Sequence, residues 1–185
     1  MNPSHNLFII GPTGAGKTSI GRRLAVHYGL PFVDIDHEIE RQCGVDVSTV
    51  FEIEGEAGFR QRESAAIDAC SQRHGVLMAT GAGAVLAPSN RQHLLERGFV
   101  VWLQAEIEHQ LERLERDTHR PLLAGADQRQ RLLAMARARE PLYRDIAELV
   151  VPGEHGSVAT ATERSIVLID HHWQRHPLAS TQQTA

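Results

Sequence analysis

The segment "LFIIGPTGAGKTSIGRRL", residues 7–24, joins a short apolar run to a glycine-rich loop and then to a basic segment of helical period. Its centre, "GPTGAGKT", fits the phosphate-binding pattern G-x-x-x-x-G-K-[ST] in full. Gly11, Gly14 and Gly16 let the loop turn with its backbone N–H groups pointing inward, where they can hold phosphate. A strand before the loop and a helix after it are the context in which this pattern binds nucleotides, so we predict a nucleoside triphosphate site.

The side chains of this loop suit phosphate and metal. Lys17 can reach the β- and γ-phosphates, and Thr18 can hold Mg²⁺. Lys17 is the only lysine among 19 basic residues, at a place where a compact ammonium on a flexible stem serves better than a guanidinium. The nucleotide-binding residues that we predict from the loop are Gly11, Gly14, Ala15, Gly16, Lys17, Thr18 and Ser19.

Short apolar runs alternate with longer segments of helical period along the chain. The runs that predict strands are Leu7–Ile10, Phe32–Asp34, Val76–Ala79, Phe99–Leu103 and Leu149–Val151. The segments that predict helices are Lys17–Tyr28, Ala57–Arg73, Pro88–Arg97, Glu106–Glu115, Asp127–Tyr143 and about Ser157–Trp173, the last with Ser157 as N-cap. Apolar strands separated by amphipathic helices are typical of parallel sheets covered on both faces. We therefore predict an α/β fold, a three-layer sandwich with a five-stranded parallel sheet.

Two segments interrupt this alternation. Residues 37–63 hold short helical pieces, "HEIERQCG" and "STVFEIEG", ahead of a longer helix, and residues 117–126, "DTHRPLLAGA", are rich in Pro, Gly and Ala. Segments of this kind on a rigid sheet usually cover a substrate, so we interpret the first as a substrate-binding insert and the second as a lid. Both belong to one predicted domain over residues 1–173, and the polar tail 174–185 is expected to be disordered.

Composition narrows the partners and the compartment. A formal net charge of −4 and a pI near 6.2 argue against nucleic acid and against an anionic membrane surface. Cys43 and Cys70 lack CxxC spacing and predict buried thiols in a reducing compartment. The N-terminus does not resemble a leader, and no 18-residue apolar segment is present. We expect a cytoplasmic protein that binds no membrane, and a monomer, because no apolar surface stripe is obvious.

A pair of carboxylates follows the second apolar run. The segment "FVDID", residues 32–36, places Asp34 and Asp36 at the carboxyl end of a predicted strand, the edge where α/β sheets bind ligands. In extended chain both side chains would point the same way, so that one meets the water shell of a metal while the other accepts a hydrogen bond from an acceptor hydroxyl. The alternative is a strand end that caps the helix at "HEIE". No NKxD guanine signature and no strand ending in a D-E pair is found, which favours a kinase over a GTPase or a motor.

In this order and spacing the motifs resemble the shikimate kinases. The segment "FEIEGEAGFRQRE" matches the family pattern F-x-x-x-G-E-x-x-F-R-x-x-E at Phe51, Gly55, Glu56, Phe59, Arg60 and Glu63. "ATGAGAV" stands where the family has a Gly-Gly-Gly turn, and "RPLL" at 120–123 and "REPLY" at 139–143 follow. The resemblance covers about residues 7–157. It implies a P-loop fold like that of nucleoside-monophosphate kinases. It also implies ATP-dependent phosphorylation of the 3-hydroxyl of shikimate, which yields shikimate 3-phosphate and ADP on the route to chorismate and aromatic amino acids.

The resemblance also implies roles for single residues. The catalytic residues that it implies are Lys17, Asp36 and Arg120. In the family, the residue at Asp36 orients the reacting hydroxyl and the one at Arg120 closes over the phosphoryl group from the lid. Arg113 and Arg120 complete the ATP site, with Arg113 over the adenine. Thr18 and, through water, Asp34 hold Mg²⁺, the expected cofactor. The shikimate-binding residues that it implies are Asp36, Arg60, Gly81, Ala82, Gly83 and Arg139, with both arginines on the carboxylate and with Phe51 and Phe59 packed against the ring.

The chain departs from the family pattern at two places. Ala82 replaces the middle glycine of the turn, and a methyl there is tolerable at negative φ and costly at positive φ. "PGEHGS", residues 152–157, stands where the family often has an arginine beside adenine, and His155 is a candidate substitute. Two alternatives stay open. The first is a kinase of another small polyol acid such as gluconate, which Ala82 permits although the carboxylate-binding arginines argue against it. The second is a non-catalytic ligand-sensing domain, and the retained catalytic residues argue against it.

Overall fold

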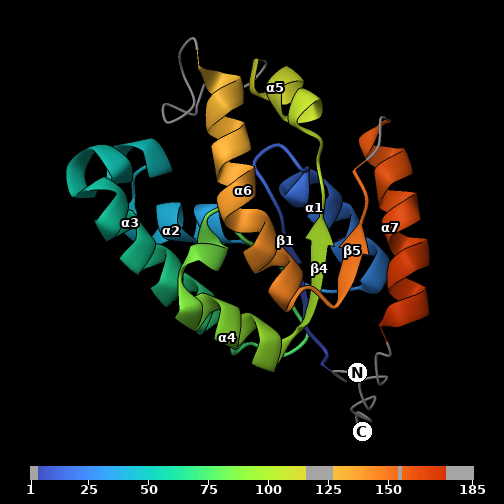
Figure 1. Ribbon diagram of the computed structural model, residues 1–185. Coiled ribbons are helices and arrows are strands. Elements are labelled where there is room, and N and C mark those ends of the chain that lie inside the picture. The colour runs from blue at the N-terminus through green and yellow to red at the C-terminus, as the bar shows by residue number, and fades with distance from the viewer. Residues whose placement is uncertain (1–3, 116–126, 154–155, 174–185) are drawn as a thin grey trace, which may run out of the picture.

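The computed structural model describes residues 4–115, 127–153 and 156–173. At its centre lies a five-stranded sheet in the order β2-β3-β1-β4-β5, with every neighbouring pair parallel (Figure 1). The strands are β1 (Leu7–Ile10), β2 (Phe32–Asp34), β3 (Leu77–Ala79), β4 (Phe99–Leu103) and β5 (Leu149–Val151). The predicted sheet is confirmed, and only β3 differs in its bounds, because it begins one residue later than expected.

Helices cover both faces of the sheet, because successive strand residues alternate between two apolar cores. Phe8 and Ile10 of β1 face a core that includes side chains of α2, α3, α4 and α6. Leu7 and Ile9 face a second core that includes side chains of α1 and α7. The helices are α1 (Lys17–Tyr28), α2 (Ile35–Cys43), α3 (Val47–Ser71), α4 (Pro88–Arg97), α5 (Ile107–Glu115), α6 (Gln128–Ile146) and α7 (Val158–His172), with a 3₁₀ turn η1 (Ala84–Leu86). The predicted three-layer sandwich is therefore confirmed (Figure 1).

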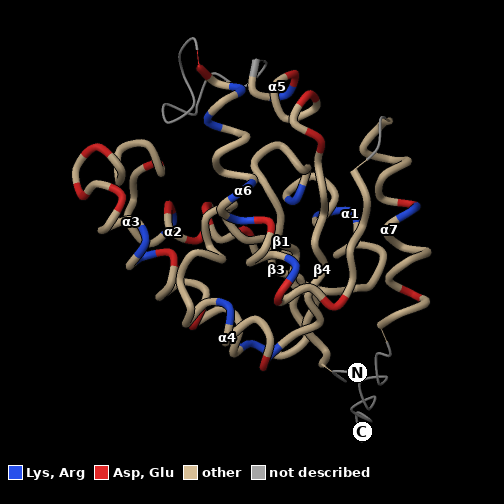
Figure 2. The backbone as a smooth tube through the Cα atoms, in the orientation of Figure 1, with Lys and Arg blue, Asp and Glu red and all other residues tan. Residues whose placement is uncertain are grey.

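The predicted insert consists of α2 and the first part of α3. Gly44 ends α2 in a left-handed conformation, and Asp46 caps α3 by accepting a hydrogen bond from the N–H of Thr49. Gly55, at φ 69°, breaks α3 before its longer part, as the sequence pattern predicts. In Figure 1 and Figure 2, α3 lies at the left of the view and its longer part runs down toward α4.

The helices α5 and α6 flank the predicted lid. They pack through a small apolar cluster around Leu114 and Leu132. Arg120 and the rest of residues 116–126 lie outside the described part of the chain, as do His155 and the tail 174–185. The predictions for the lid and the tail therefore stay predictions. The N-cap predicted for the last helix is confirmed, because the Ser157 hydroxyl accepts from the N–H of Thr160 at 3.1 Å.

The two cysteines are free thiols in different surroundings. Cys70 is buried in the α3 core, and burial raises the pKa of its thiol. Cys43 is only partly buried, which corrects the expectation of two buried thiols, because it is the last residue of α2 and exposed residues follow it. Among the helices that the structure describes, none is both long and apolar enough to cross a membrane.

Candidate active site

The phosphate loop connects β1 to α1 in the form that the sequence predicts. Gly16 caps α1 in a left-handed conformation at φ 86°, and Lys17 opens the helix. The Lys17 ammonium donates hydrogen bonds to the carbonyls of Gly11 at 2.9 Å and Pro12 at 2.8 Å, so it folds back across the loop. The one lysine of the chain thus lies over the concave side of the loop, where a phosphate would sit.

Thr18 and Asp34 meet at the mouth of the loop. The Thr18 hydroxyl donates to Oδ2 of Asp34 at 2.7 Å, while Oδ1 of Asp34 accepts from the backbone N–H of Asp36 at 3.1 Å and caps α2. The strand ends at Asp34, and Asp36 lies in the first turn of α2. The expectation that both carboxylates project from extended chain is therefore wrong. Capping and metal binding are not exclusive alternatives here, because Asp34 uses one oxygen for the cap and offers the other to Thr18.

A pocket of about 260 Å³ brings the phosphate loop and the acidic residues together. Its walls come from the loop, from the start of α2 and from the turn after β3. The lining residues are Gly14, Gly16, Lys17, Thr18, Ser19, Asp34, Asp36, Thr80, Gly81, Ala82, Arg113 and Val158. Of the predicted loop residues, Gly11 and Ala15 do not line this pocket; Ala15 is buried behind the loop.

Arg60 and Glu63 form a buried ion pair beside this pocket. Nη1 of Arg60 donates to Oε2 of Glu63 at 2.7 Å, and Nη2 donates to the exposed Glu56 at 3.3 Å. Glu63 is only 1% exposed. Its burial raises the pKa of its carboxyl, Asp36 acts in the same direction, and Arg60 and Arg139 act against it. These electrostatic effects indicate that Asp36, Arg60 and Arg139 all lie within range of the Glu63 carboxyl.

The turn Gly81–Gly83 packs directly on these side chains. A Cβ at Gly81 would lie 2.4 Å from Oε1 of Glu63, and a Cβ at Gly83 would lie 2.3–2.5 Å from the Arg60 guanidinium. Ala82 has no positive φ, since no described non-glycine residue has one. A side chain at either flanking glycine would therefore have to displace the Glu63 carboxylate or the Arg60 guanidinium. The methyl of Ala82 is tolerated, which settles the question that this departure raised about the turn.

Comparisons with known proteins agree on the family. The family model described as shikimate kinase matches residues 13–169. A shikimate kinase of Bordetella pertussis is 53% identical over 156 residues, covering 84% of this chain and 73% of that protein. One from Stenotrophomonas maltophilia is 46% identical over 180 residues, covering 97% of this chain and 100% of that protein. The chain belongs to the shikimate kinase family.

A solved structure supports the same assignment. The shikimate kinase from Acinetobacter baumannii, determined in complex with shikimate, has a TM-score of 0.87 and 39% identity, over 92% of this chain and 95% of that one. The fold is that of the P-loop kinases related to nucleoside-monophosphate kinases. Like its family, the chain is an ATP-dependent kinase.

Two arginines, Arg113 and Arg164, line a small space beside the phosphate loop. The Arg113 guanidinium donates to the carbonyl of Gly14, which places this predicted adenine-side residue against the phosphate loop. The volume of this space is about 30 Å³. Its lining includes Arg113, Arg164 of α7, and Pro152 and Gly153, which precede that helix. The sequence assigned no role to Arg164, because a single arginine in an amphipathic helix does not differ from any other solvated residue.

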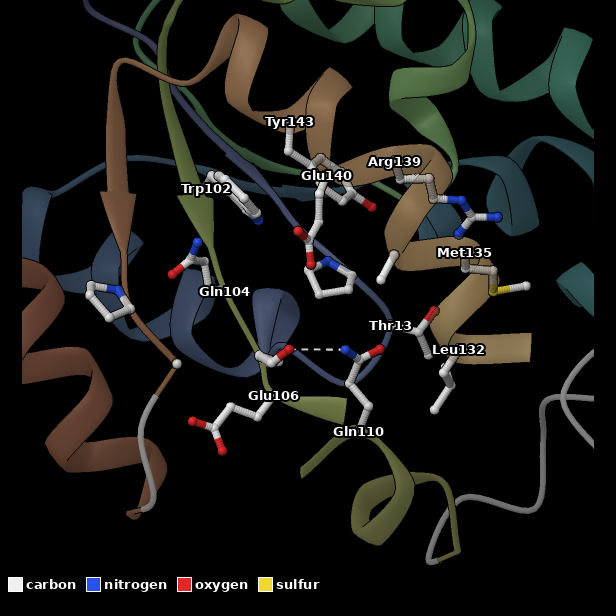
Figure 3. Close-up of a pocket in the computed structure, with 15 residues that line it drawn as sticks. Thr13, Trp102, Gln104, Glu106, Gln110, Leu132, Met135, Arg139, Glu140 and Tyr143 are labelled. Atoms are coloured by element: carbon white, nitrogen blue, oxygen red, sulfur yellow. Dashed lines mark hydrogen bonds between the residues drawn. The ribbon is translucent and has the colours of Figure 1, made fainter. Parts of the chain in front are cut away.

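Arg139 and Tyr143 reach the site from α6. Both line a larger cavity, of about 400 Å³, whose wall on the loop side is Pro12 and Thr13 (Figure 3). This cavity shares no lining residue with the 260 Å³ pocket. In Figure 3 the Arg139 side chain extends away from Trp102 and Glu140. Sequence reasoning carried Arg139 over from the family but assigned no role to Tyr143 or to Glu63, whose motif positions do not reveal what they contact.

Proposed function

We propose that this kinase transfers the γ-phosphoryl group of ATP to the 3-hydroxyl of shikimate, giving shikimate 3-phosphate and ADP, on the route to chorismate and aromatic amino acids. The observation that carries the proposal is the 260 Å³ pocket, whose walls combine the phosphate loop with Asp36 and the turn Gly81–Ala82. A hydroxyl held at Asp36 would therefore lie next to the phosphates bound by the loop.

Asp36 is the proposed orienting group and base. Its carboxylate accepts a hydrogen bond from the reacting hydroxyl and takes its proton as the new P–O bond forms and the bond to ADP breaks. Lys17 holds the β- and γ-phosphates from the opposite wall and stabilises the charge that develops between them. The role of Arg120 in the predicted lid, contact with the transferring phosphoryl group, remains a prediction.

Mg²⁺ is the proposed cofactor, and the donor set fits it. The Thr18 hydroxyl and an Asp34 carboxylate oxygen lie 2.7 Å apart at the mouth of the loop, and Mg²⁺ prefers such oxygen ligands together with phosphate and water. Within residues 4–115, 127–153 and 156–173, no group of three or more His, Cys, Asp or Glu could hold a metal alone. When bound, Mg²⁺ neutralises phosphate charge.

The substrate carboxylate is proposed to bind Arg60 and Arg139. Both arginines act electrostatically on Glu63, and Arg60 is oriented by ion pairs with two glutamates. A pre-oriented guanidinium suits a planar carboxylate. The stacked rings of Phe51 and Phe59, with centroids 4.3 Å apart, supply the apolar surface proposed to face the ring. The same proposal includes a monomeric, cytoplasmic protein with one kinase domain over residues 1–173.

The experiment is ADP release by the purified chain with Mg-ATP, compared among shikimate, quinate, gluconate and no acceptor. We expect release with shikimate alone, and ³¹P–¹H coupling in the product should place the phosphate on the 3-oxygen. A preparation of Lys17→Ala made in parallel excludes contaminating kinases. Equal release with gluconate, or none with shikimate, would overturn the proposal.

A further inference from the structure

Tyr143 contacts the substrate-binding turn although it lies 61 residues away in sequence. Its hydroxyl donates a hydrogen bond to the carbonyl of Ala82 at 2.5 Å. The side chain is 1% exposed, and its ring packs beside Trp102 of β4, with centroids 5.6 Å apart. The ring is therefore held by packing, and the hydroxyl presents a fixed donor to the middle of the turn.

This hydrogen bond orients one peptide group of the turn. The carbonyl of Ala82 and the N–H of Gly83 belong to the same planar peptide unit and point in opposite directions. Because Tyr143 holds the carbonyl toward α6, the N–H of Gly83 must point away from α6. The carbonyls of Gly81 and Gly83 are bonded within the following 3₁₀ turn, to the N–H groups of Ala84 and Leu86.

The N–H groups of the turn are available for a ligand. Within the described part of the chain, the N–H groups of Ala82 and Gly83 donate to no other residue. Buried or half-buried N–H groups normally find a partner. Arg60 lies against Gly83, and Glu63 lies against Gly81, so these donors belong to the same cluster as the side chains proposed to bind shikimate.

We propose that Tyr143 is a positioning residue for the acceptor substrate: its hydroxyl holds the Ala82–Gly83 peptide in the orientation that presents the N–H of Gly83 to shikimate. The inference rests on the proposed function and deepens it. Tyr143 also lies one helical turn after Arg139 on α6. The same helix therefore carries Arg139, which is proposed to bind the substrate, and Tyr143, which holds the turn. The substrate's partners on the turn and on α6 are thereby held in one rigid frame.

Ala82 makes this chain's turn stiffer than a run of three glycines. An alanine has fewer accessible backbone states than a glycine, so part of the turn's order comes from residue 82 itself. Tyr143 supplies the other part. The two contributions act on the same peptide, and substitutions at the two positions should therefore not be additive.

The test compares Tyr143→Phe with Tyr28→Phe in the active enzyme. Both are conservative changes at the only two tyrosines of the chain; the Tyr28 hydroxyl donates to Asp170 on the α1–α7 side, and its ring also packs against a tryptophan. We expect Tyr143→Phe to raise KM for shikimate roughly tenfold, the usual effect of one lost hydrogen bond, with KM for ATP unchanged. Tyr28→Phe should change neither constant. A role in folding alone would lower the melting temperature and the active fraction without separating the two KM values, and that result would overturn the proposal.

A second variant keeps the proposal testable if Tyr143→Phe folds poorly. With Tyr143 in place, Ala82→Gly should raise KM for shikimate by less than Tyr143→Phe does, because the Tyr143 hydroxyl still holds the turn. In the double variant, the increase in KM should exceed the product of the single effects. A large effect of Ala82→Gly alone, or strictly multiplicative effects, would contradict the proposal. Absence of shikimate-dependent ADP release in the wild type would instead refute the proposed function, so the two failures are distinguishable.

Discussion

The Thr18 hydroxyl lies 2.7 Å from Oδ2 of Asp34 and donates a hydrogen bond to it across the gap between the phosphate loop and the end of β2. Asp34 is at the same time the N-cap of α2, through its other oxygen. The position of Asp36 in the first turn of that helix therefore depends on the residue that is also proposed to hold the metal. The proposed metal site, the cap of α2 and the position of the proposed base are linked through a single carboxylate.

Removal of the Thr18 hydroxyl should weaken the use of Mg²⁺. Thr18→Val keeps the shape of the side chain but loses the oxygen, and we expect a fall in kcat/KM of about 100-fold and a higher Mg²⁺ requirement. Thr18→Ser keeps the oxygen and serves as the matched control. Rates measured across a Mg²⁺ titration at fixed ATP provide the comparison. If both variants show the same Mg²⁺ dependence, Thr18 does not hold the ion.

Asp36→Asn should separate ATP binding from turnover. The change removes the negative charge that accepts the hydroxyl proton, so kcat should fall by about 10²–10⁴-fold. The affinity for ATP, measured by calorimetry, should stay near that of the wild type, because the phosphate loop is intact. Asp145→Asn, at an exposed position of α6, controls for loss of charge. Full turnover in Asp36→Asn would remove this residue from the mechanism.

Arg139→Ala should act on shikimate and leave ATP unaffected. Loss of a charge-assisted hydrogen bond of about 2–4 kcal/mol predicts that KM for shikimate rises by roughly 30- to 1,000-fold. Arg137→Ala, at an exposed position of the same helix, is the matched control and should behave like the wild type. Steady-state kinetics with each substrate varied in turn makes the distinction. An unchanged KM for shikimate would place the carboxylate elsewhere.

Glu63 should make stability depend on pH in a definite direction. Burial raises the pKa of its carboxyl above the ordinary value of 4.5, so between those two values the folded chain binds more protons than the unfolded chain. The free energy of unfolding should therefore fall as pH rises from about 4.5 through the folded pKa, and level off above it. Urea unfolding of Glu63→Gln across this range should show a flatter slope. Glu56→Gln, which alters the exposed partner of Arg60, should keep the wild-type slope. An equal slope in all three proteins would show that the pKa of Glu63 does not differ between the folded and the unfolded chain.

Lys17 offers a chemical test, because it carries the only ε-amine of the chain. Acetylation of this amine removes the charge and the donors that contact the phosphates, so we expect loss of activity in step with modification of Lys17, followed by mass spectrometry. Mg-ATP should protect the residue by occupying the loop. An enzyme fully acetylated at Lys17 that kept its turnover would contradict the assigned role.

Much of the fold could be predicted because the signals are local. The strand bounds of β1, β2, β4 and β5 and the helix bounds of α1 and α4 agree with those read from hydrophobic period, since each segment's pattern reflects the single face that it buries. The phosphate loop is equally local, because its glycines and Lys17 act within one turn of chain. Such features are determined by neighbouring residues whatever the rest of the molecule does.

Contacts between distant segments were beyond prediction from these patterns. Nothing near Tyr143 indicates that its hydroxyl meets Ala82, and nothing in "FRQRE" indicates that Glu63 is buried while Glu56 is exposed. Family motifs named Arg60, Arg139 and the turn without showing how they are held. The sequence by itself determined the order of elements, the phosphate loop and the family. The tertiary structure decided which side chains the glycines of the turn contact and which partner each side chain has, because those depend on distances between elements that only packing of the whole chain sets.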